Sequence, residues 1–460
     1  LALLMFLGFS VVYGLRVNLS VAMVAMVNAT DPSVDRNTSA APACPLPAGS
    51  GNSSGTPQYP WDSETQGWLL GAFFFGYLCT QIPGGYLAGH YGGSRFLGVG
   101  VLGTAALTLL TPLAAGWGSR WLFALRALEG FGEGVTYPSM MAMWTRWAPP
   151  LERSRLMTLS GSGGSFGAFV ALPLTGFICE KLGWPAVFYL CGGAGCLWSI
   201  FWFAFVSDDP HTHRRISEEE RDYIIKTSSL LPQGTGHGWS LPLLSMVLSV
   251  PLWAIIFTQM CSNWTFYTLL TSLPTYMNDV LHFDLQSNGF LSALPYLGNL
   301  LMSLLAGVAA DFLMERKVFS TTTVRKAFTF TGLLLPALFL VLVSYVGCDH
   351  ALIVTFLTLS TSSGGISSSL VFPGRYAGFL LGITNTFGTI PGIMAPIVTG
   401  HFTEDRSLDG WRTVFWVAAG INVGGAVFYT VFGSGRIQPW ANTEENRAEP
   451  ERTRARTATR

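Results

Sequence analysis

Twelve apolar segments, each long enough to cross a lipid bilayer, set the architecture of this 460-residue chain. A membrane-spanning helix needs about 20 apolar residues. Inside hydrocarbon every backbone N–H and C=O group has to be paired within its own segment, so we expect each segment to be an α-helix. The expected spans are residues 1–27, 66–88, 96–116, 119–143, 156–179, 184–206, 248–277, 288–313, 327–347, 351–372, 376–400 and 411–433.

The composition agrees with a membrane protein. Half of the residues are hydrophobic and 11% are charged, whereas soluble domains carry about 25% charged residues. One soluble core cannot bury so much apolar surface, so we expect much of it to contact membrane lipids. The formal net charge is +0, which gives no indication of a nucleic-acid partner. No nucleophile–base pair and no metal-ligand spacing is visible, so we expect no enzyme activity, no metal and no bound cofactor.

Two polar stretches divide the chain. Residues 28–65 are rich in Asn, Ser, Pro and Gly, and residues 207–247 contain a run of charges. The second stretch separates six segments in residues 1–206 from six in residues 248–433, and a polar tail follows at 434–460. Six plus six segments with a long central loop resemble the major facilitator fold. We therefore expect an all-α membrane protein with twelve transmembrane helices in two six-helix halves.

Positive charge predicts the orientation. Lys and Arg gather in one set of loops, which places both termini and the central loop 207–247 in the cytosol. The loop 28–65 then faces the lumen, where Asn28, Asn37 and Asn52 begin sequons for glycosylation. Cys44 in this loop and Cys348 in another loop on the same side are candidate disulfide partners in an oxidising lumen.

Five charged residues fall within or against the expected spans: Arg16, Arg126, Glu129, Glu133 and Asp311. A charge at the centre of a bilayer costs about 2.5–3.5 kcal/mol on the most lenient scale, so such residues are functional candidates by default. Arg16 has no acid within a helical turn. Its guanidinium either pairs with an acid on another helix or, since its planar fork suits a carboxylate, binds an anionic substrate beside Tyr13.

The fourth expected span carries three of these charges. Arg126, Glu129 and Glu133 are spaced i, i+3, i+7 and lie on one helical face. We expect Arg126 and Glu129 to pair, which leaves Glu133 without that partner. A buried carboxylate without a counter-charge readily takes up a proton, so Glu133 is a candidate proton carrier. The alternative is a purely structural charge cluster. Interleaved glycines on this span predict close approach of another helix.

A loop motif recurs after the second span of each half. The stretch from Gly85 to Arg95 and the stretch from Gly307 to Lys317 occupy matching places, and both resemble the facilitator loop between the second and third helices of a half. The first copy has Gly89 where that motif usually has Asp. We therefore expect Asp311 to supply the charge contact of a gate.

Longer motifs resemble the anion–cation symporter family of phosphate and vesicular anion carriers, and in particular its lysosomal acidic-sugar carriers. The stretches that carry the resemblance are Tyr13–Ser20, Thr80–Tyr86, Arg126–Gly134, Trp147–Arg153, Asn263–Leu270, Asn288–Gly298 and Gly382–Phe387.

The resemblance implies proton-coupled export of sialic acid, glucuronate and other acidic monosaccharides, and transport of aspartate or glutamate. The proton is the coupling ion. It implies the lysosomal membrane, with synaptic vesicles and the plasma membrane as further locations. It also implies that Arg16 contacts the substrate carboxylate, that the charges of the fourth span couple protons, and that four aromatic residues line the central cavity: Tyr13, Phe74, Tyr77 and Tyr267.

Two positions qualify this expectation. Vesicular glutamate carriers of the family have Arg where this chain has Asn263, so one carboxylate on a neutral polyol fits this chain better than a dicarboxylate. The region 369–378 is shorter than the family pattern. The alternatives left open are therefore a phosphate or organic-anion carrier of the plasma membrane and a transport-inactive form.

Overall fold

The protein is an α-helical bundle. The computed structural model describes residues 1–27, 59–149, 152–211, 213, 215–229, 246–316, 319–369 and 377–434. All regular secondary structure in these ranges is helical. The helices are α1 (Ala2–Met26), α2 (Ser63–Tyr91), α3 (Gly93–Leu109), α4 (Thr111–Trp117), α5 (Ser119–Glu133), α6 (Thr136–Trp147), α7 (Arg153–Leu182), α8 (Trp184–Phe205), α9 (Glu218–Ser229), α11 (Val250–Asp279), α12 (Leu285–Glu315), α13 (Thr321–Val346), α14 (His350–Gly364), the short 3₁₀ helix η1 (Gly365–Ser369), α15 (Ala377–Phe402) and α16 (Leu408–Phe432).

Each expected span falls on helix, and three of the twelve are broken. The third is α3 followed by α4, bent by 48°, with Pro112 at the start of α4, where proline's missing N–H is harmless. The fourth breaks at Gly134 and Val135 into α5 and α6. The tenth is α14 continued by η1. The length of the apolar segments predicted the spans but not these breaks.

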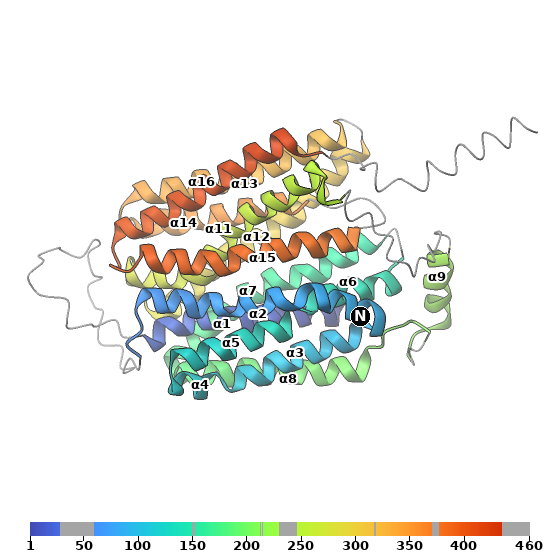
Figure 1. Cartoon of the computed structure of the whole chain (residues 1–460), viewed down its shortest axis with the longest axis horizontal. Coiled ribbons are helices and arrows are strands. Elements are labelled where there is room, and N and C mark those ends of the chain that lie inside the picture. Colours follow the sequence, from blue (N-terminus) through green and yellow to red (C-terminus); the bar gives the residue numbers. More distant parts are fainter. Residues whose placement is uncertain are drawn as a thin grey trace, which may run out of the picture.

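The two halves repeat one packing plan (Figure 1). In the amino-terminal half α1 packs on α7 and α8, α2 on α5, and α3 on α8. In the carboxy-terminal half α11 packs on α15 and α16, α12 on α14, and α13 on α16. The halves meet through two matching pairs, α7 with α12 and α2 with α15. This reciprocity is the pseudo-twofold relation expected of a six-plus-six transporter.

Glycines let the two halves approach closely at one end of the bundle. A methyl group on Gly176 of α7 would lie 2.5 Å from the carbonyl oxygen of Leu285, where α12 begins. A methyl group on Gly67 of α2 would lie 2.5 Å from the carbonyl oxygen of Pro396 in α15. Backbones in such contact leave no room for a side chain. The other end of the bundle carries Leu1 and α9 (Figure 1), and we call it the α9 end.

Hydropathy alone recovers only part of the membrane domain. Within the described ranges six helices are long and apolar enough to cross a membrane, or seven if the bent pair of α3 and α4 counts as one span. The helices that fail this test include α2, α11 and α15, which pack between the halves or line the central cavity. A helix that faces protein and a polar cavity needs no continuous apolar surface.

Several lumenal predictions fall on residues that the structure does not describe. Asn28, Asn37, Asn52 and Cys44 lie outside the described ranges, so the glycosylation sites and the pairing of Cys44 stay predictions. Cys348 takes part in a disulfide. The free cysteines are Cys79, Cys179, Cys191, Cys196 and Cys261.

Candidate functional site

A polar cavity of about 360 Å³ lies between the two halves, within the size range of small-molecule sites. Its walls come from the first parts of α7, α11 and α15, at residues such as Gly161, Ile255 and Asn385. These helices begin at the α9 end (Figure 1). The later parts of α7 and α15 instead seal the opposite end through the glycine contacts. The cavity therefore lies toward the α9 end.

Arg16 of α1 is the charged residue among the described residues that line this cavity. It is 6% exposed and sits among aromatic rings. Its guanidinium carbon lies 4.5 Å from the ring centroid of Tyr13, 4.8 Å from that of Tyr77, 5.2 Å from that of Phe73 and 5.9 Å from that of Phe74. Ring faces attract a cation without neutralising it, so this setting retains a positive charge at the cavity wall.

Arg16 also forms a buried ion pair with Glu133 of α5, 117 residues away in sequence. Its Nε donates to Glu133 Oε1 at 3.0 Å, and its Nη2 donates to the same oxygen. The second oxygen, Oε2, has no hydrogen-bond partner among the described residues. The expectation that Glu133 is left without a counter-charge is therefore wrong, because the tertiary fold brings the side chain of Arg16 in α1 to it.

The expected local pair between Arg126 and Glu129 is confirmed. Arg126 Nη1 donates to Glu129 Oε2 at 2.6 Å. Thr111 donates to the other carboxylate oxygen at 3.1 Å. Arg126 further donates to two backbone carbonyls of α1, at Leu15 (3.4 Å) and Arg16 (3.2 Å). This second arginine thus fixes the α1 backbone at the residue that faces the cavity.

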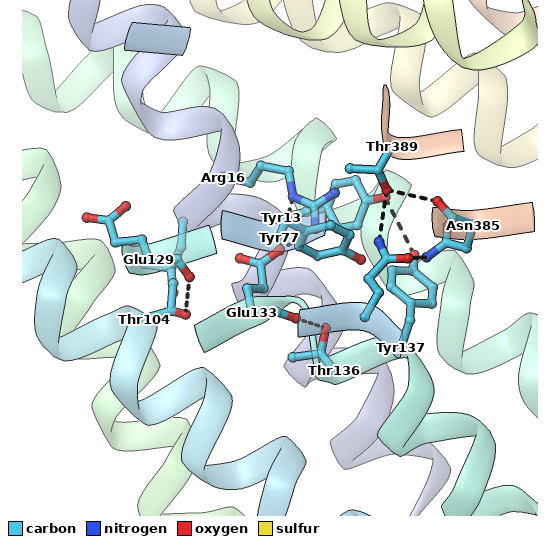
Figure 2. Close-up of polar contacts among 12 residues, drawn as sticks. Tyr13, Arg16, Tyr77, Thr104, Glu129, Glu133, Thr136, Tyr137, Asn385 and Thr389 are labelled. Atoms are coloured by element: carbon cyan, nitrogen blue, oxygen red, sulfur yellow. Dashed lines mark hydrogen bonds and ion pairs between the residues drawn. The ribbon is translucent and has the colours of Figure 1, made fainter. Parts of the chain in front are cut away.

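Two glycines at the carboxy-terminal end of α5, Gly130 and the capping residue Gly134, bring these charges together. A side chain on Gly130 would collide with the backbone of Phe73 in α2, and one on Gly134 would collide with the carbonyl oxygen of Tyr77. The resulting close contact of α5 with α2 holds Glu133 beside the aromatic rings that surround Arg16 (Figure 2). The predicted packing role of these glycines is confirmed.

Three of the four expected aromatic residues line the cavity: Tyr13, Tyr77 and Tyr267. Phe74 does not. It is 1% exposed and lies behind the wall, with its ring centroid 4.7 Å from that of Tyr267. Phe74 and Tyr77 lie one turn apart on the same face of α2, but Phe74 is nearer the sealed end, where its ring packs against Tyr267 and against Gly392 of α15. Phe74 supports Tyr267 and Arg16 from behind.

Asn263 lines the cavity, but its amide is engaged within the protein. Its Nδ2 donates to the carbonyl oxygen of Gly388 in α15 at 2.8 Å, and its Oδ1 accepts from Gln259 at 3.3 Å. The residue therefore ties α11 to α15. At this position the cavity wall is neutral, in keeping with the expectation drawn from the sequence.

The site includes polar residues that the sequence analysis missed. Tyr137 of α6 lines the cavity, and its hydroxyl lies 3.5 Å from that of Tyr13. Gln81 of α2 is 3% exposed and bonds α15 at three places: its Nε2 donates to Thr389 at 2.8 Å, and its Oε1 accepts from Asn385 at 3.3 Å and from Thr386 at 3.1 Å. Figure 2 shows Asn385 and Thr389 of this cluster. The sequence could have indicated this cluster, because Gln81 and Asn385 are polar residues within two expected membrane spans, 66–88 and 376–400.

The gating prediction is only partly described. Asp311 lies in α12, and its side chain is outside the described part of the structure. In the first copy of the motif, Gly89 accepts a hydrogen bond from Arg146 through its carbonyl oxygen at 3.2 Å. Asp208, far along the chain, accepts from the backbone N–H of Ser94 at 2.7 Å at the start of α3. A carboxylate thus reaches this helix start without an aspartate at position 89.

One enzyme-like pattern does occur and carries no chemistry here. Residues 163–167 read Gly-Gly-Ser-Phe-Gly, which matches the letters of the hydrolase motif G-x-S-x-G. That motif needs a sharp strand-to-helix turn, whereas these residues lie inside α7. Gly163 and Gly167 instead contact the α1 backbone, and the Ser165 hydroxyl donates to Asn299 at 3.4 Å.

The family model described as Major Facilitator Superfamily matches residues 4–396 and 281–458. With a pseudo-symmetric pair of six-helix halves around a polar cavity, the chain belongs to this superfamily of multi-pass membrane transporters. Sialin from Homo sapiens is 51% identical over 450 residues, which cover 96% of this chain and 90% of sialin. The probable small intestine urate exporter of Homo sapiens is 39% identical, over 94% of this chain and 89% of that protein. The resemblance to the anion–cation symporter family is confirmed.

A solved structure agrees with the fold. The bacterial homolog of the human lysosomal transporter Spinster, in an inward-facing and occupied conformation, superposes with a TM-score of 0.67 at 13% identity, covering 95% of this chain and 98% of that chain. Both the relatives and the fold are those of transporters rather than enzymes.

Proposed function

We propose that this protein is a proton-coupled secondary transporter that exports sialic acid and other acidic monosaccharides from lysosomes. The observation that carries the proposal is that, among the described residues of the cavity wall, Arg16 is the one cation and it faces neutral polar side chains. One positive charge matches one carboxylate, and neutral amides and hydroxyls match the hydroxyl groups of a sugar. The likeness to sialin supports the same substrate class.

The ion pair with Glu133 supplies a route to proton coupling. While Glu133 is ionised, its carboxylate occupies the Nε–Nη2 edge of Arg16 and neutralises the charge that a substrate carboxylate needs. Protonation of Glu133 removes its charge, so Arg16 is released to bind the substrate anion bidentately. The proton and the anion then bind together, and an acidic lumen favours loading. The pair of Arg126 and Glu129 holds α1 in place and is the second proton-coupling candidate.

The orientation predicted from positive charge puts the α9 end in the cytosol. The cavity lies toward this end while the glycine contacts close the other, so the conformation is the one that releases substrate to the cytosol. Rocking of the halves about α2, α7, α12 and α15 would reverse the access. A lysosomal membrane, with synaptic vesicles and the plasma membrane as further sites, fits the proton gradient that such an exporter uses.

A second candidate is a plasma-membrane carrier of phosphate or another organic anion, whereas aspartate and glutamate belong with the first candidate as further substrates in vesicles. The likeness to a probable urate exporter favours this candidate, and a single arginine can serve any small anion. A transport-inactive form also remains a hypothesis, since residues 370–376 of the shortened region lie outside the described ranges.

The deciding experiment is uptake of labelled sialic acid into proteoliposomes with and without an inward-directed proton gradient. We expect uptake that the gradient stimulates and that Arg16→Ala abolishes. Labelled urate, phosphate and aspartate are tested in the same way. Uptake of urate or phosphate without any uptake of sialic acid would establish the second candidate. No uptake of any of these anions by a folded chain would establish the inactive form.

A further inference from the structure

The central cavity continues past Arg16 into the interior of the carboxy-terminal half. Its far wall is built by α11, α12, α13, α14 and α16, through residues that include Thr265, Asn299, Thr361 and Asn422. Small residues such as Gly332 of α13 and Gly364 of α14 leave space there. This extension, which we call the carboxy-half subsite, lies on the opposite half from Arg16.

Two buried polar side chains in this subsite lack partners. Asn422 of α16 is 1% exposed, and its Nδ2 donates to Thr265 at 2.9 Å. Its Oδ1 has no hydrogen-bond partner among the described residues. The hydroxyl of Thr361 in α14 is also without a partner there, in a residue that is 4% exposed. Leaving such groups unpaired costs free energy. Both belong to residues that line the cavity, so a hydrogen-bonding ligand held there would supply the partners they lack.

The neighbours of these groups are fixed by the protein. Asn299 of α12 donates to the carbonyl oxygen of Thr361 at 2.9 Å, and Thr265 holds one end of the Asn422 amide. The free end of the Asn422 amide is therefore held in one orientation. No residue that lines this part of the described cavity carries a charge, so the subsite suits hydroxyl or amide groups and not a second carboxylate.

We propose that Asn422 and Thr361 form a specificity-determining subsite that binds the uncharged, hydroxylated end of the substrate while Arg16 holds its carboxylate. The inference rests on the proposed function and deepens it, because it says how the protein tells an acidic sugar from a small carboxylate. A hydrogen-bonding site rejects analogues that lack the matching groups more strongly than an apolar pocket does.

The test compares sialic acid with an analogue whose glycerol side chain has been shortened, in proteoliposomes that contain the full chain. The variants are Asn422→Leu and Thr361→Val. The control is Thr358→Val, the same substitution one turn earlier on α14, where the hydroxyl is also unpartnered but does not line the cavity. In the parent chain, shortening the substrate should raise KM about three- to tenfold, as expected for one or two neutral hydrogen bonds.

In each subsite variant KM for sialic acid should rise by a similar factor. Replacing sialic acid by the shortened analogue should then raise the KM of that variant by less than a further twofold. Thr358→Val should behave like the parent. The subsite does not contact the substrate if both variants keep the parent's KM, or if shortening the substrate raises their KM by the same factor as it raises the parent's. The proposed function still stands in that case. If the parent takes up no acidic sugar, the proposed function and this inference both fail.

Discussion

Arg16 of α1 and Glu133 of α5 share a single carboxylate oxygen. The Nε and Nη2 donors of Arg16 both reach Oε1 of Glu133, and Oε2 has no partner among the described residues. The guanidinium lies at the cavity wall, and the carboxylate lies behind it, fully buried. This order places an internal anion in direct competition with any anion that enters the cavity.

Glu133→Gln should uncouple substrate binding from pH. The neutral amide cannot occupy Arg16 as an ion, so the variant resembles the protonated protein at every pH. We expect the parent to bind sialic acid about tenfold more tightly at pH 5 than at pH 7.5, and the variant to bind with a flat profile near the acid value. Calorimetric titration in detergent measures this difference. A variant that kept the parent's pH dependence would remove Glu133 from the coupling mechanism.

Arg126→Leu should destabilise the protein more than the double change Arg126→Leu with Glu129→Leu. The single change leaves Glu129 charged and unpaired in a fully buried setting, which costs about 3–5 kcal/mol. The double change removes both charges, so most of that loss should be recovered. Unfolding followed by tryptophan fluorescence in detergent gives the comparison. Equal losses in the two variants would mean that Arg126 stabilises mainly through its bonds to the α1 backbone.

Gly176→Val should shift the protein away from the conformation described here. The added side chain would meet the α12 backbone and push the halves apart at the end opposite α9. We expect cysteines introduced into the sealed end to react with a water-soluble maleimide several times faster in this variant. Gly193→Val on α8 is the control, since nothing lies within 4 Å of a methyl group there. Unchanged labelling would show that the α7–α12 contact does not limit opening.

The amino-terminal cap of α2 should make a small contribution to stability that disappears in acid. Asp62 accepts a hydrogen bond from the Thr65 N–H at 2.9 Å, and its bonds with Thr65 hold the pKa of Asp62 below its ordinary value. A lowered folded-state pKa stabilises the fold above the unfolded pKa, about 3.9, and the effect fades as pH falls through the folded-state pKa. The cap should therefore be intact at pH 5.

Asp62→Ala tests this cap by thermal unfolding in detergent. At pH 6 it should cost about 1 kcal/mol, the usual value for a lost cap. Asp62→Asn keeps an acceptor that does not titrate, so it should retain most of the stability at pH 6 and lose less than the parent between pH 5 and pH 3. A parent and an Asp62→Asn variant with identical acid profiles would contradict the assignment.

The sequence predicted the membrane helices better than it predicted the contacts between them. Apolar length and backbone pairing are local requirements, so segments such as 184–206 fall almost directly on helices like α8. The pair of Arg126 and Glu129 could also be predicted, because three residues on one helix set their distance. The breaks between α3 and α4 and between α5 and α6 could not, since a proline or glycine is often tolerated within a membrane helix.

The sequence by itself determined that this chain spans a membrane through two sets of six apolar segments and that a few charges lie inside them. Only the tertiary structure decided which charges meet, since Arg16 and Glu133 are separated by 117 residues and share no local periodicity. It also turned Phe74 away from the cavity, bound the Asn263 amide to α15, and left the polar ends of Asn422 and Thr361 free. The physical reason is that spacing fixes the neighbours on one helix, whereas the partner across an interface depends on how whole helices pack.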